Sequence, residues 1–81
     1  MQIRVLFFAQ LRDITNKKEI IIEAPENCTI TDLKPVIAKL YPDVRPFFET
    51  ISFAVDNEYV SSEKILEPEC CVALIPPISG G

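Results

Sequence analysis

Two strongly apolar segments lie near opposite ends of this sequence, and their positions constrain the fold more than any other feature. Residues 2–8 are β-branched and aromatic, and their side chains alternate so that Ile3, Val5 and Phe7 share one face. Residues 71–75 form a second apolar run. If the two strands are neighbours in the middle of one sheet, they run parallel, because the long connection between them is a crossover. The sequence therefore predicts a mixed sheet with its first and last strands at the centre.

One long helix is predicted over residues 30–41, where apolar side chains recur every three or four positions. Thr29 and Asp32 have the spacing of a capping box, which marks the start of a helix. Pro35 is unfavourable beyond the first turn, because it lacks a backbone donor and crowds the preceding turn. Either Thr31 is the true cap or the helix begins irregularly.

The remaining elements are expected to be short. We expect a helical turn or loop over 9–16, strands over 18–23, 51–55 and 58–60, a turn at Asp56-Asn57, a loop over 43–50 and a polar segment over 61–69. The fold class is therefore α+β, and the arrangement is a β-grasp, a mixed sheet of about five strands with one main helix packed across it. At 81 residues, the chain 1–81 is expected to form a single domain.

Charge and composition exclude several classes of partner. The net charge is −4, and the eight Lys and Arg residues are scattered along the sequence, so neither nucleic acid nor an anionic membrane is an expected partner. The first residues run directly into a strand, with no targeting segment and no apolar stretch long enough to span a bilayer. A cytoplasmic location is therefore expected.

Most catalytic groups are missing from the composition. The chain has no His, and its three cysteines, Cys28, Cys70 and Cys71, are one short of a four-thiolate metal site. Adjacent residues on a strand point to opposite faces, so Cys70 and Cys71 are poorly placed to bridge, and all three are expected to be reduced. We expect no metal site, no permanently bound cofactor and no enzymatic activity of the chain alone.

The last residues, Gly80 and Gly81, are the only glycines of the chain, and they follow Pro76-Pro77. Proline restricts the backbone to extended conformations, so residues 76–81 are expected to form an extended tail. A terminus without Cβ atoms suits a narrow channel, where it can offer its α-carboxylate to a second protein's active site. The alternative is an ordinary frayed end.

Three motifs together carry a resemblance to a known family. Residues 72–81 (VALIPPISGG), 5–12 (VLFFAQLR) and 54–57 (AVDN) resemble the small subunit of molybdopterin synthase, over essentially the whole chain. One departure concerns the turn before the last strand, where many members have Asp-Gly-Asp-Glu and this chain has Pro-Glu-Cys-Cys at 68–71. That turn must form without glycine.

The resemblance implies a ubiquitin-like sulfur carrier. In that family an E1-like adenylyltransferase uses ATP to adenylate the terminal glycine, here Gly81, which is then converted to a thiocarboxylate. The tail, here Pro76, Pro77, Ile78, Ser79 and Gly80, enters the active site of the large subunit. There the sulfur is transferred to precursor Z, the cyclic pyranopterin monophosphate, to form the molybdopterin dithiolene. The expected assembly with the large subunit is a heterotetramer.

A partner interface is predicted on the sheet face opposite the helix, where Leu6, Phe8, Ala73 and Ile75 stack on adjacent strands, with Arg12 as a further contact. Scattered apolar surface residues are the alternative explanation. Three other functions remain open: a ubiquitin-like modifier, a thiamine-type sulfur carrier, and a β-grasp interaction module with an unused tail. A sulfur-relay role for Cys70 or Cys71 is less favoured, because no residue near them in sequence is placed to lower a thiol pKa.

Overall fold

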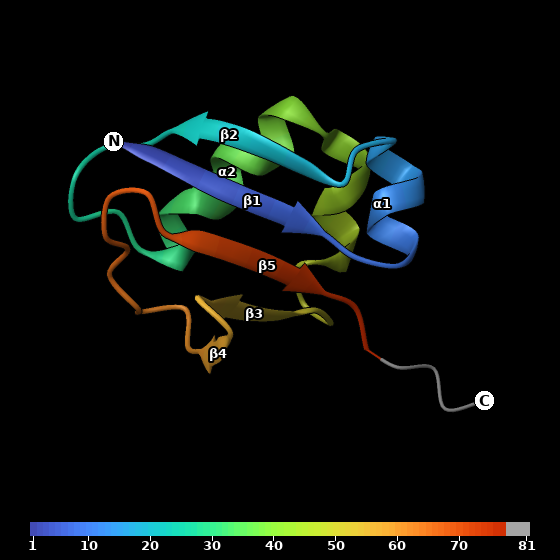
Figure 1. The fold of residues 1–81 in the computed structure, drawn as a ribbon. Coiled ribbons are helices and arrows are strands. Elements are labelled where there is room, and N and C mark those ends of the chain that lie inside the picture. The colour runs from blue at the N-terminus through green and yellow to red at the C-terminus, as the bar shows by residue number, and fades with distance from the viewer. Residues whose placement is uncertain (78–81) are drawn as a thin grey trace.

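A computed structural model describes residues 1–77, which form one five-stranded sheet with helices on one of its faces (Figure 1). The strand order is β2-β1-β5-β3-β4. In chain order the elements are β1 (Gln2–Phe7), α1 (Gln10–Thr15), β2 (Glu19–Glu23), α2 (Ile30–Leu40), the 3-10 helix η1 (Pro42–Phe47), β3 (Ser52–Val55), β4 (Glu58–Val60) and β5 (Cys71–Ile75). The predicted α+β class and β-grasp arrangement are confirmed.

The two most apolar strands lie side by side near the middle of the sheet. β1 and β5 are parallel, with Val5 opposite Val72, whereas β1 pairs antiparallel with β2, and β3 pairs antiparallel with both β5 and β4. The predicted parallel pairing is therefore confirmed. Asp56 and Asn57 link β3 to β4 with φ of 49° and 74°, which is typical of a two-residue hairpin turn.

Helix α2 begins at a complete capping box. The Thr29 hydroxyl oxygen accepts from the backbone N–H of Asp32 at 3.2 Å, and the Asp32 carboxylate accepts from the N–H of Thr29 at 3.1 Å. Thr31 is therefore not the cap; its N–H and its hydroxyl both donate to the carbonyl of Ser62, each at 3.1 Å. Pro35 lies on an exposed part of the helix, where water can solvate the carbonyl that it leaves without a donor.

The core lies between α2 and the sheet. Side chains from both layers are completely or almost completely buried there: Ile3, Val5, Phe7, Ile30, Leu33, Ile37, Val72 and Leu74. Alternate residues of β1 and β5 point into this layer, as the period of a strand requires.

The boundaries differ from the prediction in several places, two of them at the start of a strand: β2 begins at Glu19 and β3 at Ser52. Residues 42–47 form η1 instead of a loop, because Pro42 suits the first position of a helix and Val44 is buried in the core. β1 ends at Phe7, one residue early, because Ala9 has a positive φ of 50° and turns the chain. α2 ends at Leu40 rather than at residue 41.

The turns of residues 1–77 form without glycine. Six other residues take positive φ: Ala9, Asn16, Asn27, Asp56, Asn57 and Glu69. Four of these are Asn or Asp, which tolerate that region best. Glu69, with φ of 63°, supplies the positive φ in the turn before β5, where glycine stands in many members of the family that this chain resembles.

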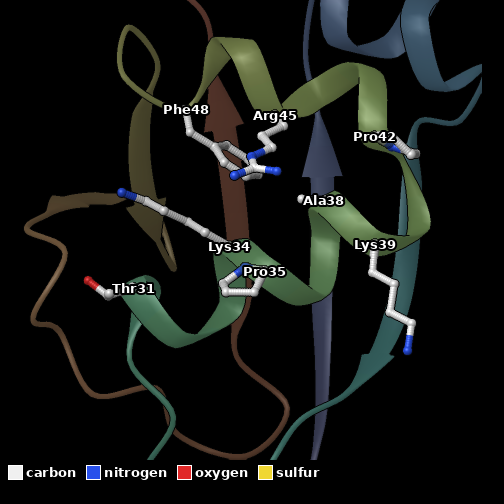
Figure 2. Close-up of a pocket in the computed structure, with 8 residues that line it drawn as sticks. All are labelled: Thr31, Lys34, Pro35, Ala38, Lys39, Pro42, Arg45 and Phe48. Atoms are coloured by element: carbon white, nitrogen blue, oxygen red, sulfur yellow. The ribbon is translucent and has the colours of Figure 1, made fainter.

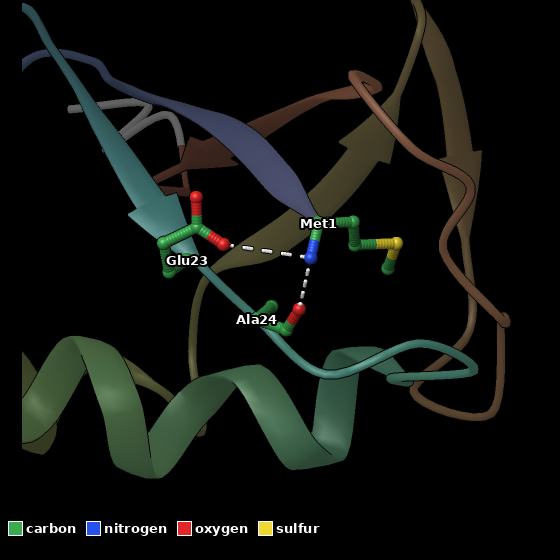
Figure 3. A network of polar contacts seen from close by, with 3 residues as sticks. All are labelled: Met1, Glu23 and Ala24. Carbon is green, nitrogen blue, oxygen red and sulfur yellow. Dashed lines mark hydrogen bonds and ion pairs between the residues drawn. The ribbon is translucent and has the colours of Figure 1, made fainter.

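The start of the sheet is also joined by polar contacts (Figure 3). The Met1 ammonium donates to the Ala24 carbonyl at 2.7 Å and lies 3.5 Å from a Glu23 carboxylate oxygen. The Ala24 N–H donates in turn to the Met1 carbonyl at 2.8 Å. These contacts hold the beginning of β1 against the end of β2.

Candidate functional site

The sheet face away from α2, called here the open face, carries no helix of the described residues (Figure 1). A row of apolar side chains crosses four of its strands. Leu6 pairs with Ala73, Ala73 with Ala54, and Ala54 with Tyr59. This register places short side chains in the middle of the row, between Leu6 and Tyr59.

The open face is hollowed by a depression of about 340 Å³. Four residues predicted as a partner interface line it: Leu6, Phe8, Ala73 and Ile75. Leu6, Ala73 and Ile75 are half-buried, and Phe8 is 37% exposed. The structure therefore brings these four together, although Phe8 lies just beyond β1 and not on it.

Sequence reasoning missed two further members of this depression, Ala54 and Tyr59. Tyr59 is 72% exposed, the most exposed of the large apolar side chains on the described residues. The sequence places Tyr59 on a predicted strand. It does not show which face of the sheet the side chain occupies, because that depends on the pairing of β4 with β3. Asp56 and Asn57 lie at the rim, since they also line the depression.

Arg12, the fifth predicted interface residue, lies elsewhere. It is exposed on α1 and lines a separate depression with Asp13, Asn16, Lys17 and Lys18. The structure does not bring its side chain into the depression of the open face.

The thiol at the rim of the open face is held in its neutral form. Burial raises the pKa of Cys71 above its ordinary value of 9.0; Arg4 acts in the opposite direction, and Asp56 and Glu19 raise the pKa further. The Asp56 carboxylate also accepts from the Cys71 N–H at 3.1 Å.

Cys71 is half-buried, whereas Cys28 and Cys70 are buried, and burial is the main cause that raises the pKa of both. A relay thiol reacts as its thiolate. These environments therefore disfavour a sulfur-relay role for Cys70 and Cys71.

The root of the predicted tail continues from the end of β5, the central strand of the sheet. Ile75 ends β5 and lines the depression, Pro76 is buried, and Pro77 is exposed. The chain thus emerges at the edge of the open face. The predicted tail residues Ile78, Ser79, Gly80 and Gly81 lie outside the described residues.

Within 1–77, no three His, Cys, Asp or Glu side chains gather as a metal-binding group. None of the helices in that range combines the length and the apolar character that crossing a membrane requires.

Comparison with known proteins identifies relatives over the full length. The sequence model of the ThiS family matches residues 5–81. The molybdopterin synthase sulfur carrier subunit of Chlamydomonas reinhardtii is 35% identical over 83 residues, and the alignment covers 100% of both chains. This name agrees with the family that the sequence motifs predicted.

Two solved structures share the fold. SAMP1 from Haloferax volcanii superposes with a TM-score of 0.89 at 19% identity, covering 100% of both chains. The second is a complex of subunits 1 and 2 of molybdopterin-converting factor from Helicobacter pylori, matched with a TM-score of 0.72 at 20% identity over 100% of both chains. At these identities the two structures support the β-grasp fold.

Proposed function

We propose that this chain is the sulfur-carrier subunit of a molybdopterin synthase. The chain belongs to the ThiS family. The observation that carries the proposal is the position of the tail root, which leaves the sheet at the edge of an apolar depression. A partner that covers this depression receives the tail at the same time. The full-length relative with the same role supports the assignment.

The proposed reaction takes place at the α-carboxylate of Gly81. An E1-like adenylyltransferase transfers AMP from ATP to this carboxylate and releases pyrophosphate, which makes the carboxyl carbon electrophilic. A sulfur donor then displaces AMP and leaves a thiocarboxylate. The sulfur is a soft nucleophile that is largely ionised at neutral pH, and it is donated to precursor Z to build the dithiolene. ATP belongs to the activating enzyme, and the carrier holds no permanent cofactor.

The large subunit is the proposed partner of the open face. Leu6, Phe8, Ala73 and Ile75 form the docking surface, together with Ala54 and Tyr59 from the neighbouring strands. Burial of half-exposed apolar side chains supplies the driving force for docking. Residues 76–80 then reach the active site of the large subunit, and the assembly is a heterotetramer. Arg12 remains a proposed contact outside this surface.

The whole chain, 1–81, acts as one carrier domain in this proposal, and catalytic groups come from its partners. A cytoplasmic location is part of the proposal, because the three cysteines of the structure are free thiols.

The decisive test follows sulfur to the chain terminus. Incubation with the activating enzyme, ATP and a sulfur donor should exchange one oxygen for sulfur on the peptide that contains Gly81, as read by tandem mass spectrometry.

Deletion of Gly81 should abolish molybdopterin formation with the large subunit and precursor Z, yet leave folding and docking nearly unchanged. Normal molybdopterin yield from the deleted chain would refute the carrier role, and lysine-linked conjugates without molybdopterin would favour a modifier.

The docking surface is tested by a matched pair of variants. Ile75→Asp places a charge in the depression of the open face and should weaken binding of the large subunit in titration calorimetry. Leu40→Asp introduces the same charge at an apolar residue that is 55% exposed on α2, and it should leave the affinity unchanged. The reverse result would place the interface on the helix side of the sheet.

A further inference from the structure

A further concave surface lies between α2 and η1, on the helix side of the sheet (Figure 2). It is a groove of about 490 Å³, a volume in the range of ligand and peptide sites. Its apolar lining consists of Pro35, Ala38, Pro42 and Phe48. Because α2 separates this groove from the open face, a molecule bound here leaves the open face free.

Three cationic side chains line the groove: Lys34 and Lys39 from α2, and Arg45 from η1. They are separated in the sequence, so the linear pattern of charge does not reveal them as a cluster. No acidic residue lines the groove. Within residues 1–77 the two ion pairs are Met1 with Glu23 and Arg4 with Glu19, so neither uses these cations. A chain of net charge −4 thus gathers three cations at one groove, and none of them forms an ion pair within residues 1–77.

The cations do not converge on one point. In Figure 2 the Lys34 and Lys39 side chains extend away from one another, with Pro35 and Ala38 between them, and Arg45 projects from the opposite wall. The Lys34 ammonium lies 5.4 Å from the centroid of the Phe53 ring, a cation–π contact that favours this position. A single phosphate needs donors that converge, whereas spaced cations fit spaced anions.

We propose that this groove docks an extended, acidic segment of a partner protein. Carboxylates of the segment pair with Lys34, Lys39 and Arg45, and one apolar side chain between them packs against Phe48 and Pro35. Nucleic acid is disfavoured as the occupant because the groove offers only three cations, too few to follow a phosphate backbone beyond it. The proposal does not depend on sulfur transfer, because it uses neither the open face nor the tail.

A defined peptide tests this proposal. A short acetylated and amidated peptide, rich in glutamate with one central leucine, is titrated into the isotope-labelled full chain and followed by NMR. We expect saturable shifts of backbone amides in α2 and η1, with none on the strands of the open face. Replacing both Lys34→Gln and Arg45→Gln should weaken binding about fivefold, the scale of two exposed ion pairs, and added salt should weaken binding to the unaltered chain.

The matched control is the double change Lys17→Gln and Lys18→Gln, which removes the same charge from the depression beside α1. This variant should bind the peptide as the unaltered chain does, and thermal unfolding confirms that both double variants are folded. Equal weakening by both variants would reduce the binding to general charge attraction and overturn the proposal. Two other outcomes would also overturn it: the same saturable shifts with inorganic pyrophosphate, or self-association of the chain through the groove.

Discussion

The two faces of the sheet are made by the same strands but differ in how deeply their side chains are buried. On β1, Ile3, Val5 and Phe7 are buried beneath α2, whereas the intervening Leu6 on the open face remains half-buried. β5 repeats this pattern, with Val72 and Leu74 buried and Ala73 and Ile75 half-buried. The alternation of a strand thus gives the sheet one fully buried face, which holds the fold together, and one half-buried face, which is the proposed docking surface.

The largest expected difference between the faces is in core packing. Leu33→Ala empties a fully buried position on α2 and should lower the free energy of unfolding by about 3 kcal/mol. Leu6→Ala, on the open face, should cost less than about 1 kcal/mol. Urea denaturation followed by circular dichroism measures both. Equal losses would show that the open face contributes to the core and would remove the distinction.

A smaller effect is expected at the start of α2, which covers the buried face. Thr29→Ala removes the capping box and should cost about 1 kcal/mol. Thr50→Ala removes a single hydrogen bond from an exposed turn, from the Thr50 hydroxyl to the Phe47 carbonyl, and serves as the control with a change below about 0.5 kcal/mol. If the two variants are equally stable, the cap does not hold the helix on the sheet.

The three thiols should make stability depend on pH on both faces of the sheet. The folded-state pKa of each cysteine is raised above the ordinary 9.0, chiefly by burial, so the folded chain favours neutral thiols. The contribution of the thiols to stability should therefore be fully present below pH 9.0 and be lost as the pH rises through the higher folded-state pKa values. Denaturation at a series of pH values measures this loss, which should shrink in a variant with Cys70→Ala.

The two adjacent thiols should also differ in access. Cys71 is half-buried on the open face and Cys70 is buried, so an alkylating reagent should modify Cys71 first in the native chain. Faster modification of Cys70, read by mass spectrometry, would contradict this assignment of the two side chains.

The smallest expected effect belongs to the ion pair across β1 and β2. Arg4 Nε lies 3.3 Å from a Glu19 carboxylate oxygen, and both side chains are more than half exposed. A double-mutant cycle with Arg4→Met and Glu19→Gln should therefore give a coupling below about 0.5 kcal/mol. A coupling well above that range would show that charge, and not only apolar contact, stabilises the open face.

Local sequence patterns predicted the elements with strong periodicity. The alternation in β1 and β5 and the capping box at Thr29 were sufficient, because each depends on residues close in the chain. η1 was wrongly predicted as a loop, because its two prolines resemble loop residues, and only burial of Val44 reveals its contact with the core.

Members of the candidate site were harder to predict when they depended on pairing. Leu6 and Ala73 followed from alternation on the two central strands, which pair as predicted. Ala54 and Tyr59 were missed because their place on the open face requires the β3–β5 and β3–β4 registers. The basic groove was missed because it also depends on tertiary packing. Lys34, Lys39 and Arg45 line one groove only when η1 packs beside α2.

β5 is the last strand to be synthesised, and it lies in the middle of the sheet. The sheet is therefore complete only when the end of the chain has been made. The hairpins β1–β2 and β3–β4 share no ladder with each other; each reaches the other only through β5, which is made after both. A nascent chain that lacks β5 holds two separate hairpins, which are marginal alone. Because β5 supplies the pairing that joins the two hairpins, the proposed docking surface is complete only when β5, which leads into the tail, is in place. A chain truncated before β5 is therefore expected not to compete with the complete chain for the proposed partner.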